Sequence, residues 1–140
     1  MSANGSILAL DIGEKRVGVA LTSMAARLPH PLTTMERSNR IFKDIQELID
    51  KHAAMALVVG LPRGLDGQHT AQTGAVEQFV TDLKQIVRIP VYWQDEAVTS
   101  RQAEAELLQR GKPYKKGDID ALSATYILED FVRDNPEVIG

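Results

Sequence analysis

The apolar run from Met55 to Leu61 is the feature that most limits the folds open to this chain. It carries no charged or hydrogen-bonding side chain, and Pro62 ends it. A strand with one solvated face alternates apolar and polar residues, whereas a continuously apolar strand is buried on both faces, as the strands of parallel sheets usually are. Helices must then cover both sides of the sheet, which predicts an α/β protein.

The segments around this run supply the other elements of such a fold. Apolar runs bounded by turn residues predict strands, and apolar residues at helical spacing predict helices, the first of them with Ser38 as its N-cap. The expected strands are 7–12, 17–21, 32–35, 55–61 and 90–93, and the expected helices are about 39–52, 76–87, 99–109 and 118–132. Three β segments followed by the order αβαβαα predict a mixed five-stranded sheet whose first three strands are antiparallel.

Composition narrows the class of protein. A chain of 140 residues, 44% of them hydrophobic, is long enough to bury a core, so we expect residues 1–140 to form a single domain. The absence of cysteine excludes disulfides and thiolate metal sites, and is ordinary in a reducing compartment, which favours a cytoplasmic protein. No apolar run approaches the roughly 20 residues that span a bilayer, so no membrane partner is expected.

The charge balance bears on nucleic-acid binding. A formal net charge of -3 argues against a protein that coats nucleic acid through bulk electrostatics. A site built from carboxylates, however, contributes negative charge that bound divalent cations cancel. Local basic clusters therefore matter more than the total.

Asp11 is the most unusual carboxylate in the sequence, because it lies within the apolar strand 7–12. An unpaired carboxylate in such surroundings is costly to desolvate. Lys15 or Arg16 folding back across the hairpin, or exposure at the strand end, would each account for it. The alternative is a divalent cation shared with other acids.

Further acids stand where they can join Asp11. Asp95 and Glu96 follow a predicted parallel strand, at the edge where open α/β sheets bind ligands. One of them can cap the next helix, but neighbouring strand residues point to opposite faces, so one should point inward. Asp120 shares the apolar stripe of the last helix and should face the core, whereas Asp118 is interpreted as that helix's N-cap. Such converging carboxylates suit magnesium-dependent phosphodiester chemistry.

The ordered motifs resemble the YqgF/RuvX-type family of RuvC-related resolvases. The matching segments are Leu10 to Ala20, Val58 to Pro62, Asp66-Gly67, Asp95-Glu96 and Asp120 to Ala124. The resemblance implies a ribonuclease H-like (RNase H-like) fold, dependence on Mg²⁺ or Mn²⁺, and a nuclease acting on a four-way DNA junction (Holliday junction) or on the 5′ end of precursor 16S ribosomal RNA. On this pattern Asp11, Glu96 and Asp120 would be the metal-binding catalytic acids, with Asp95 beside them.

One position departs from the family pattern. The family usually carries an arginine after the Asp-Glu pair, where this chain has Ala97, and Arg101 is a candidate to replace its guanidinium. Basic residues expected near the cleft could contact backbone phosphates or be ordinary solvated surface charges. They are Lys15, Arg16, Arg63, Arg101, Lys115 and Lys116.

Two other functions compete with a nuclease. The Asp11 hairpin is similar to the first phosphate loop of actin-type and sugar-kinase ATPases, but 140 residues leave no room for a second lobe. A protein that binds nucleic acid without cutting it would also explain Ala97 and the acidic balance. A homodimer is expected if the substrate is a junction, because resolution needs two active sites.

Overall fold

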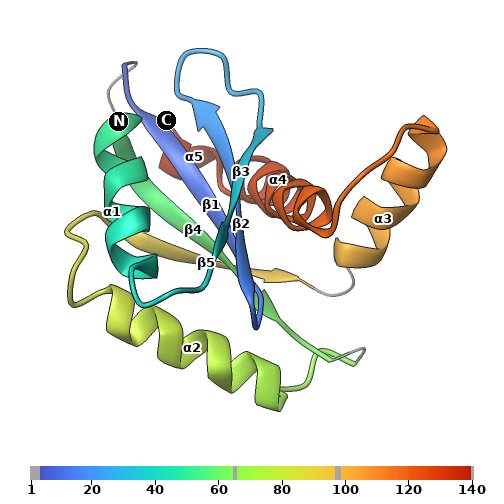
Figure 1. The fold of residues 1–140 in the computed structure, drawn as a ribbon. Coiled ribbons are helices and arrows are strands. Elements are labelled where there is room, and N and C mark those ends of the chain that lie inside the picture. The colour runs from blue at the N-terminus through green and yellow to red at the C-terminus, as the bar shows by residue number, and fades with distance from the viewer. Residues whose placement is uncertain (1–3, 65, 97–98, 140) are drawn as a thin grey trace.

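The computed structural model describes residues 4–64, 66–96 and 99–139, without the side chains of 99–104 and 139. Its elements follow one another along the chain as drawn in Figure 1. They are β1 (Ser6–Ile12), β2 (Arg16–Ser23), β3 (His30–Glu36), α1 (Ile41–Lys51), β4 (Ala54–Pro62), α2 (Ala71–Leu83), β5 (Val91–Glu96), α3 (Thr99–Arg110), α4 (Lys116–Asp134) and α5 (Pro136–Ile139).

The five strands form one sheet in the order β3-β2-β1-β4-β5. β1 pairs antiparallel with β2, and β2 pairs antiparallel with β3. β4 and β5 extend the other edge of the sheet in parallel with β1. The predicted α/β class, with a mixed five-stranded sheet and antiparallel first strands, is confirmed.

Helices cover both faces of this sheet, as the apolar run in β4 predicted (Figure 1). Leu57 and Val59 of β4 pack in one buried cluster with α1 and α2. Ala56 and Val58, which alternate with them, pack against α4 on the other face. α3 lies beside the N-terminal half of α4, where Leu107 and Leu122 form a small cluster. No helix in the described ranges combines the length and apolar composition needed to span a bilayer.

Two glycines allow α4 to lie directly on the sheet. A Cβ at Gly18 would stand 2.0 Å from the backbone oxygen of Asp120, and a Cβ at Gly60 would stand 2.4 Å from Cδ1 of Ile127. Gly18 is the cross-strand partner of Asp11. The close approach at Gly18 therefore places the backbone of Asp120 next to the strand position that carries Asp11.

Gly18→Ala should destabilise the protein by roughly 3 kcal/mol, because the added methyl collides with backbone that has no room to move. Gly74→Ala is the matched control: its Cβ meets nothing closer than 3.5 Å, and alanine is the better helix former. Urea denaturation of both variants measures the difference. Equal stability of the two variants would show that α4 is not held by contact at Gly18.

Local polar contacts shift several helix ends from their predicted places. α1 begins at Ile41 with Arg40 as N-cap, and Ser38 instead accepts a hydrogen bond from the Arg40 amide at 3.1 Å. α2 begins at Ala71, earlier than predicted, because Thr70 and Thr73 form a reciprocal capping box. The predicted cap at Ser38 and the late start of α2 are both wrong.

The last long helix also begins earlier than predicted. α4 starts at Lys116, so Asp118 is not its N-cap. The Asp118 carboxylate instead accepts a hydrogen bond from the Lys115 backbone amide at 2.9 Å. Asp118 still stabilises the helix start, but from within the first turn.

Candidate active site

Asp11 lies near the end of β1 on the face that α4 covers, with its side chain partly buried. Burial, and then the negative charge of Asp120, raises the pKa of the Asp11 carboxyl from 3.8 to about 7. No hydrogen bond or ion pair to its carboxylate is present among the described residues. Within the described part of the chain, burial of the Asp11 carboxylate is therefore not offset by a direct ion pair.

Asp120 faces the sheet from the start of α4 and pairs with Arg16. The distance from Arg16 Nε to Asp120 Oδ2 is 2.7 Å, and the side chains are 29% and 20% exposed. The sequence left open whether Arg16 folds back onto Asp11. Arg16 folds back across the hairpin, but its partner in the structure is Asp120.

Asp11 and Asp120 come together although they are far apart in the sequence. The charge of Asp120 acts on the Asp11 carboxyl, and the contact at Gly18 accounts for this proximity. The apolar stripe predicted for the last helix is confirmed, because Ala124, Ile127, Leu128 and Phe131 are all buried against the same sheet face. Two of the three acids predicted to bind metal therefore lie near each other.

Of the two neighbouring acids Asp95 and Glu96, Glu96 is the one that points inward, as the family resemblance implied, but it contacts a different part of α4. Burial, followed by a hydrogen bond with Asp130 and the charge of that residue, raises the pKa of Glu96 to about 9. Its Oε1 atom is buried without a hydrogen-bond partner among the described residues. Asp130 lies ten residues beyond Asp120, about 15 Å along a helix.

The strand register allows the separation of Glu96 from Asp11 to be estimated. Glu96 lies two strands away from β1, and its partner Pro62 lies beyond the level of Asp11. With about 4.8 Å between strands and about 3.3 Å per residue, the two Cα atoms are about 12 Å apart. The structure thus places Glu96 on the right face but turned away from the other two acids.

Asp95 lies on the opposite side of the sheet edge. Its side chain is 68% exposed, and its Oδ1 atom stands 3.5 Å from Nε of Arg63. The structure therefore groups Asp95 with Arg63 and not with Asp11. Trp93, which shares this face, packs against the cluster of α1 and α2.

The remaining basic residues are distributed around the site. Lys15 is exposed in the turn between β1 and β2, and Lys115 and Lys116 are exposed at the start of α4. Arg101 belongs to α3, but its side chain falls outside the described residues, as does Ala97 altogether. Four of the predicted basic residues therefore border the candidate site in the structure. They are Lys15, Arg16, Lys115 and Lys116.

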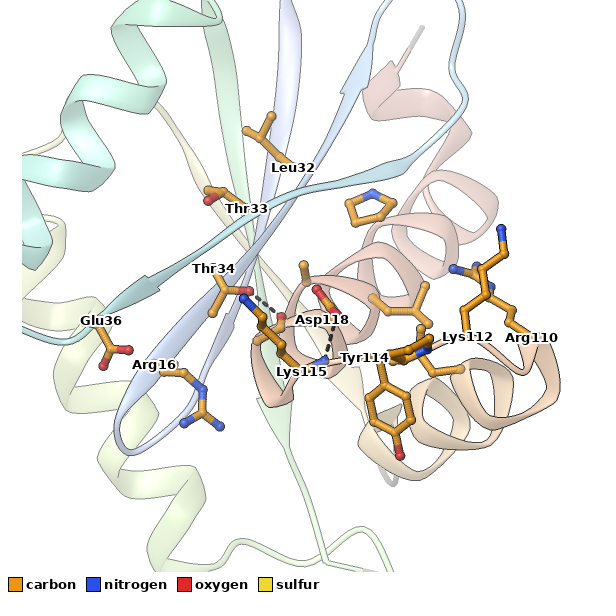
Figure 2. Close-up of a pocket in the computed structure, with 16 residues that line it drawn as sticks. Arg16, Leu32, Thr33, Thr34, Glu36, Arg110, Lys112, Tyr114, Lys115 and Asp118 are labelled. Atoms are coloured by element: carbon orange, nitrogen blue, oxygen red, sulfur yellow. Dashed lines mark hydrogen bonds between the residues drawn. The ribbon is translucent and has the colours of Figure 1, made fainter.

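Sequence reasoning missed a hollow of about 670 Å³ beside Arg16 (Figure 2). It is bounded by β3, the end of α3, the loop 111–115 and the start of α4, and its lining includes Arg110, Lys112 and Tyr114. The basic residues of that loop were the available signal. Gly18 and Gly60 were also missed, although a glycine within a strand is a sign of close backbone approach.

The acids can be tested for their fit to a divalent cation. Among the described residues, no group of three or more histidine, aspartate or glutamate side chains stands close enough to hold a metal ion. Asp11 and Asp120 nevertheless offer the hard oxygen atoms that magnesium prefers. The buried, unpartnered Oε1 of Glu96 is a further donor of the right kind. Asp11 and Asp120 can thus supply two ligands to a cation. Glu96 can supply a third only if its side chain rotates toward them.

Comparison with known proteins gives consistent results. A chain from Roseiflexus sp. (strain RS-1), described as "Putative pre-16S rRNA nuclease", is 38% identical over 135 residues, covering 94% of this chain and 96% of its own length. A chain from Chloroflexus aggregans with the same description is 39% identical over 137 residues, covering 94% and 96%.

Solved structures show the fold. RuvC of T. thermophilus, in complex with a Holliday junction substrate, superposes with a TM-score of 0.58 at 17% identity and covers 94% of this chain and 96% of its own. The Fowlpox virus resolvase in complex with Holliday junction DNA superposes with a TM-score of 0.52 at 12% identity, covering 92% and 97%. The expected RNase H-like fold is thereby confirmed.

The family described as "RuvX: Holliday junction resolvase" matches residues 5–134. This range includes both acids that the fold brings together as well as Glu96. The resemblance carried by the sequence motifs is confirmed, and the chain belongs to the RuvX family.

Proposed function

We propose that this protein is a metal-dependent nuclease that hydrolyses phosphodiester bonds in structured nucleic acid, with the 5′ end of precursor 16S ribosomal RNA as its main substrate. The observation that carries the proposal is the convergence of Asp11 and Asp120 beside Arg16 on the α4 face of the sheet. Membership of the RuvX family and the descriptions of the relatives support the class of substrate. A ribosomal RNA precursor implies action in the cytoplasm.

Asp11 and Asp120 would hold a Mg²⁺ or Mn²⁺ ion, and Glu96 would join them by rotating away from Asp130. Such an ion lowers the pKa of an attacking water and neutralises the departing oxygen. The carboxyl groups of Asp11 and Glu96, with pKa values raised to about 7 and about 9, would release their protons when a cation arrives. Arg16 and Lys15 would hold the phosphates next to the site.

A second function rests on one specific observation. Glu96 faces Asp130 and not Asp11, so a protein fixed in this arrangement would lack the third catalytic carboxylate. It would then bind structured nucleic acid without cutting it. A contribution of Asp95 to catalysis would likewise require it to leave Arg63.

Cleavage assays distinguish these functions. Labelled precursor 16S ribosomal RNA and labelled four-way DNA junctions are incubated with wild type and with Asp11→Asn, with and without Mg²⁺ or Mn²⁺. We expect wild type to trim the RNA at its 5′ end only when the metal is present, and Asp11→Asn to leave it intact. Equal cleavage by both proteins would rule out the proposed site, and binding without cleavage by wild type would establish the second function.

The same assay settles the substrate. Cleavage of the junction but not of the RNA would transfer the activity to DNA. Since resolution of a junction needs two active sites acting together, the mass of the protein in solution provides a second measurement. A strictly monomeric protein fits RNA processing, and a dimer fits junction resolution.

A further inference from the structure

We propose that the hollow between β3, the end of α3 and the start of α4 binds a single-stranded stretch of nucleic acid that leads away from the cleaved phosphate (Figure 2). This inference rests on the proposed nuclease function. It gives the active site a preference for substrates in which a single-stranded segment, or flank, adjoins the cleaved phosphate. RNA and DNA strands share the chemistry that the hollow would recognise.

The hollow is continuous with the candidate active site. Arg16 lines it and at the same time pairs with Asp120 at 2.7 Å. Its walls are tied together by the hydrogen bond that Thr34 Oγ1 donates to the Gly117 backbone oxygen at 2.5 Å, which joins β3 to the start of α4 (Figure 2). A strand that leaves Asp120 past Arg16 therefore enters the hollow directly.

Its charge suits a polyanion although the chain as a whole is acidic. The cationic side chains that line it are Arg16, Arg110, Lys112 and Lys115. Figure 2 shows Arg16 on the sheet side of the hollow, and Arg110 and Lys112 on the opposite side at and just after the end of α3. Such a local excess of positive charge attracts phosphates whatever the total charge.

Two acids beside the hollow, Asp118 and Glu36, interact with neighbouring groups of the protein. Asp118 accepts a hydrogen bond from the Lys115 backbone amide. The hydrogen bond to Asp120 raises the pKa of Arg16, and the negative charge of Glu36 contributes to this shift. Arg110 is paired with Glu106 at 3.0 Å. Lys112 and Lys115 have no ion pair among the described residues, so both ammonium groups are available for phosphate contacts.

The lining also contains the surface that an unpaired base needs. Tyr114 is partly buried and packs against the cluster of Leu107 and Leu122 while lining the hollow. An aromatic ring held in this way can stack on a base of any sequence. Bases inside a duplex are already stacked and turn only their edges to the grooves, so the apolar part of the lining favours a single strand.

The size of the hollow is consistent with this occupant. Its volume of about 670 Å³ falls within the range of about 300 to 1,000 Å³ that is usual for sites that enclose small ligands. This space is large enough for a short stretch of unpaired strand and too small to enclose a duplex.

Binding measurements without divalent metal test the hollow independently of cleavage. Labelled duplexes are compared with and without a short single-stranded flank, in RNA and in DNA versions, by fluorescence anisotropy in EDTA. We expect wild type to bind the flanked duplex roughly tenfold more tightly than the blunt one, since stacking on one aromatic ring contributes about that much. The nucleic acid, RNA or DNA, that gains more affinity from the flank is the preferred strand.

Variants connect this advantage to individual side chains. Tyr114→Leu keeps an apolar side chain in the cluster but should remove the roughly tenfold advantage of the flank, whereas Tyr114→Phe should keep it. Lys112→Gln should lower the slope of log affinity against log salt by about 0.7 for a single strand, because one phosphate contact is lost. Lys43→Gln removes the same charge from the exposed face of α1 and should leave the slope unchanged.

The outcomes separate this inference from the proposed function. Equal affinity for flanked and blunt duplexes would overturn the inference even if the metal-loaded protein cuts RNA. Loss of the advantage in both Tyr114 variants, with unchanged melting temperatures, would overturn the stacking role. A flank advantage that disappears only in Tyr114→Leu supports the inference even if cleavage is never observed.

Discussion

Asp120→Asn is expected to lower cleavage by more than roughly a hundredfold, whereas Asp118→Asn, only half a helical turn away, should retain most of the activity. Asp120 faces Asp11 and the sheet, and its carboxylate is one of the two that converge. Loss of groups that merely orient metal ligands already costs about 10- to 100-fold, so loss of a ligand should cost more. Asp118 is exposed, and its carboxylate accepts a hydrogen bond from the Lys115 backbone amide.

The comparison is made at saturating Mn²⁺ on the substrate that wild type cuts, together with the melting temperature of each variant. Asp118→Asn weakens a helix start and should lose about 1 kcal/mol of stability, so assays are run well below its melting temperature. Asp120→Asn leaves Arg16 without its carboxylate partner, but Arg16 is partly exposed and can be solvated. If Asp118→Asn were the inactive variant, the face of α4 assigned to catalysis would be wrong.

The fold was predictable from the sequence because it depends on burial patterns. β4 is apolar on both faces and therefore required helices on each side of the sheet, and the stripe on the last helix identified the residues that pack against it. Helix ends were less predictable, since they depend on single polar contacts such as the Thr70 and Thr73 pair. Several side chains at each end are chemically suitable caps, and periodicity does not choose among them.

Those parts of the site were predictable that depend on which face of a strand or helix a residue occupies. Alternation predicted that one of Asp95 and Glu96 points inward, and the family resemblance selected Glu96, which the structure places inward. Helical spacing placed Asp120 toward the sheet. The sequence could not show that α4 crosses from β2 to β5, so that its start meets Asp11 and its later turns meet Glu96 (Figure 1). That crossing is determined by the places where glycine lets the helix approach. Asp130 as a neighbour of Glu96 therefore had no signal in the sequence.

Asp11→Asn should make the metal-free protein more stable above neutral pH. The pKa of the Asp11 carboxyl is raised from 3.8 to about 7 by folding, so between these values the folded protein keeps a proton that the unfolded chain has released. The free energy of unfolding then falls as the pH rises through this window and levels off above about pH 7. A shift of this size corresponds to at most about 4 kcal/mol.

Urea denaturation in EDTA at about pH 4 and about pH 8 measures how much stability the ionised Asp11 costs. The measure is the difference in free energy of unfolding between Asp11→Asn and wild type. Glu96, whose pKa folding also raises, contributes in the same direction to both proteins, so the difference between them isolates Asp11. We expect near equality at the lower pH and a variant more stable by a few kcal/mol at the higher one, with Asp66→Asn on an exposed loop as the control.

Added Mg²⁺ should restore stability to wild type at the higher pH but not to Asp11→Asn, because an ion that binds only the folded state stabilises it by mass action. A difference in free energy of unfolding that does not change with pH would mean that Asp11 is ionised and compensated without metal. Burial of Asp11 would then not be what prepares the site for a cation. A carboxylate that costs stability when the site is empty and recovers it when a cation binds is the arrangement expected of a ligand kept for function and not for folding.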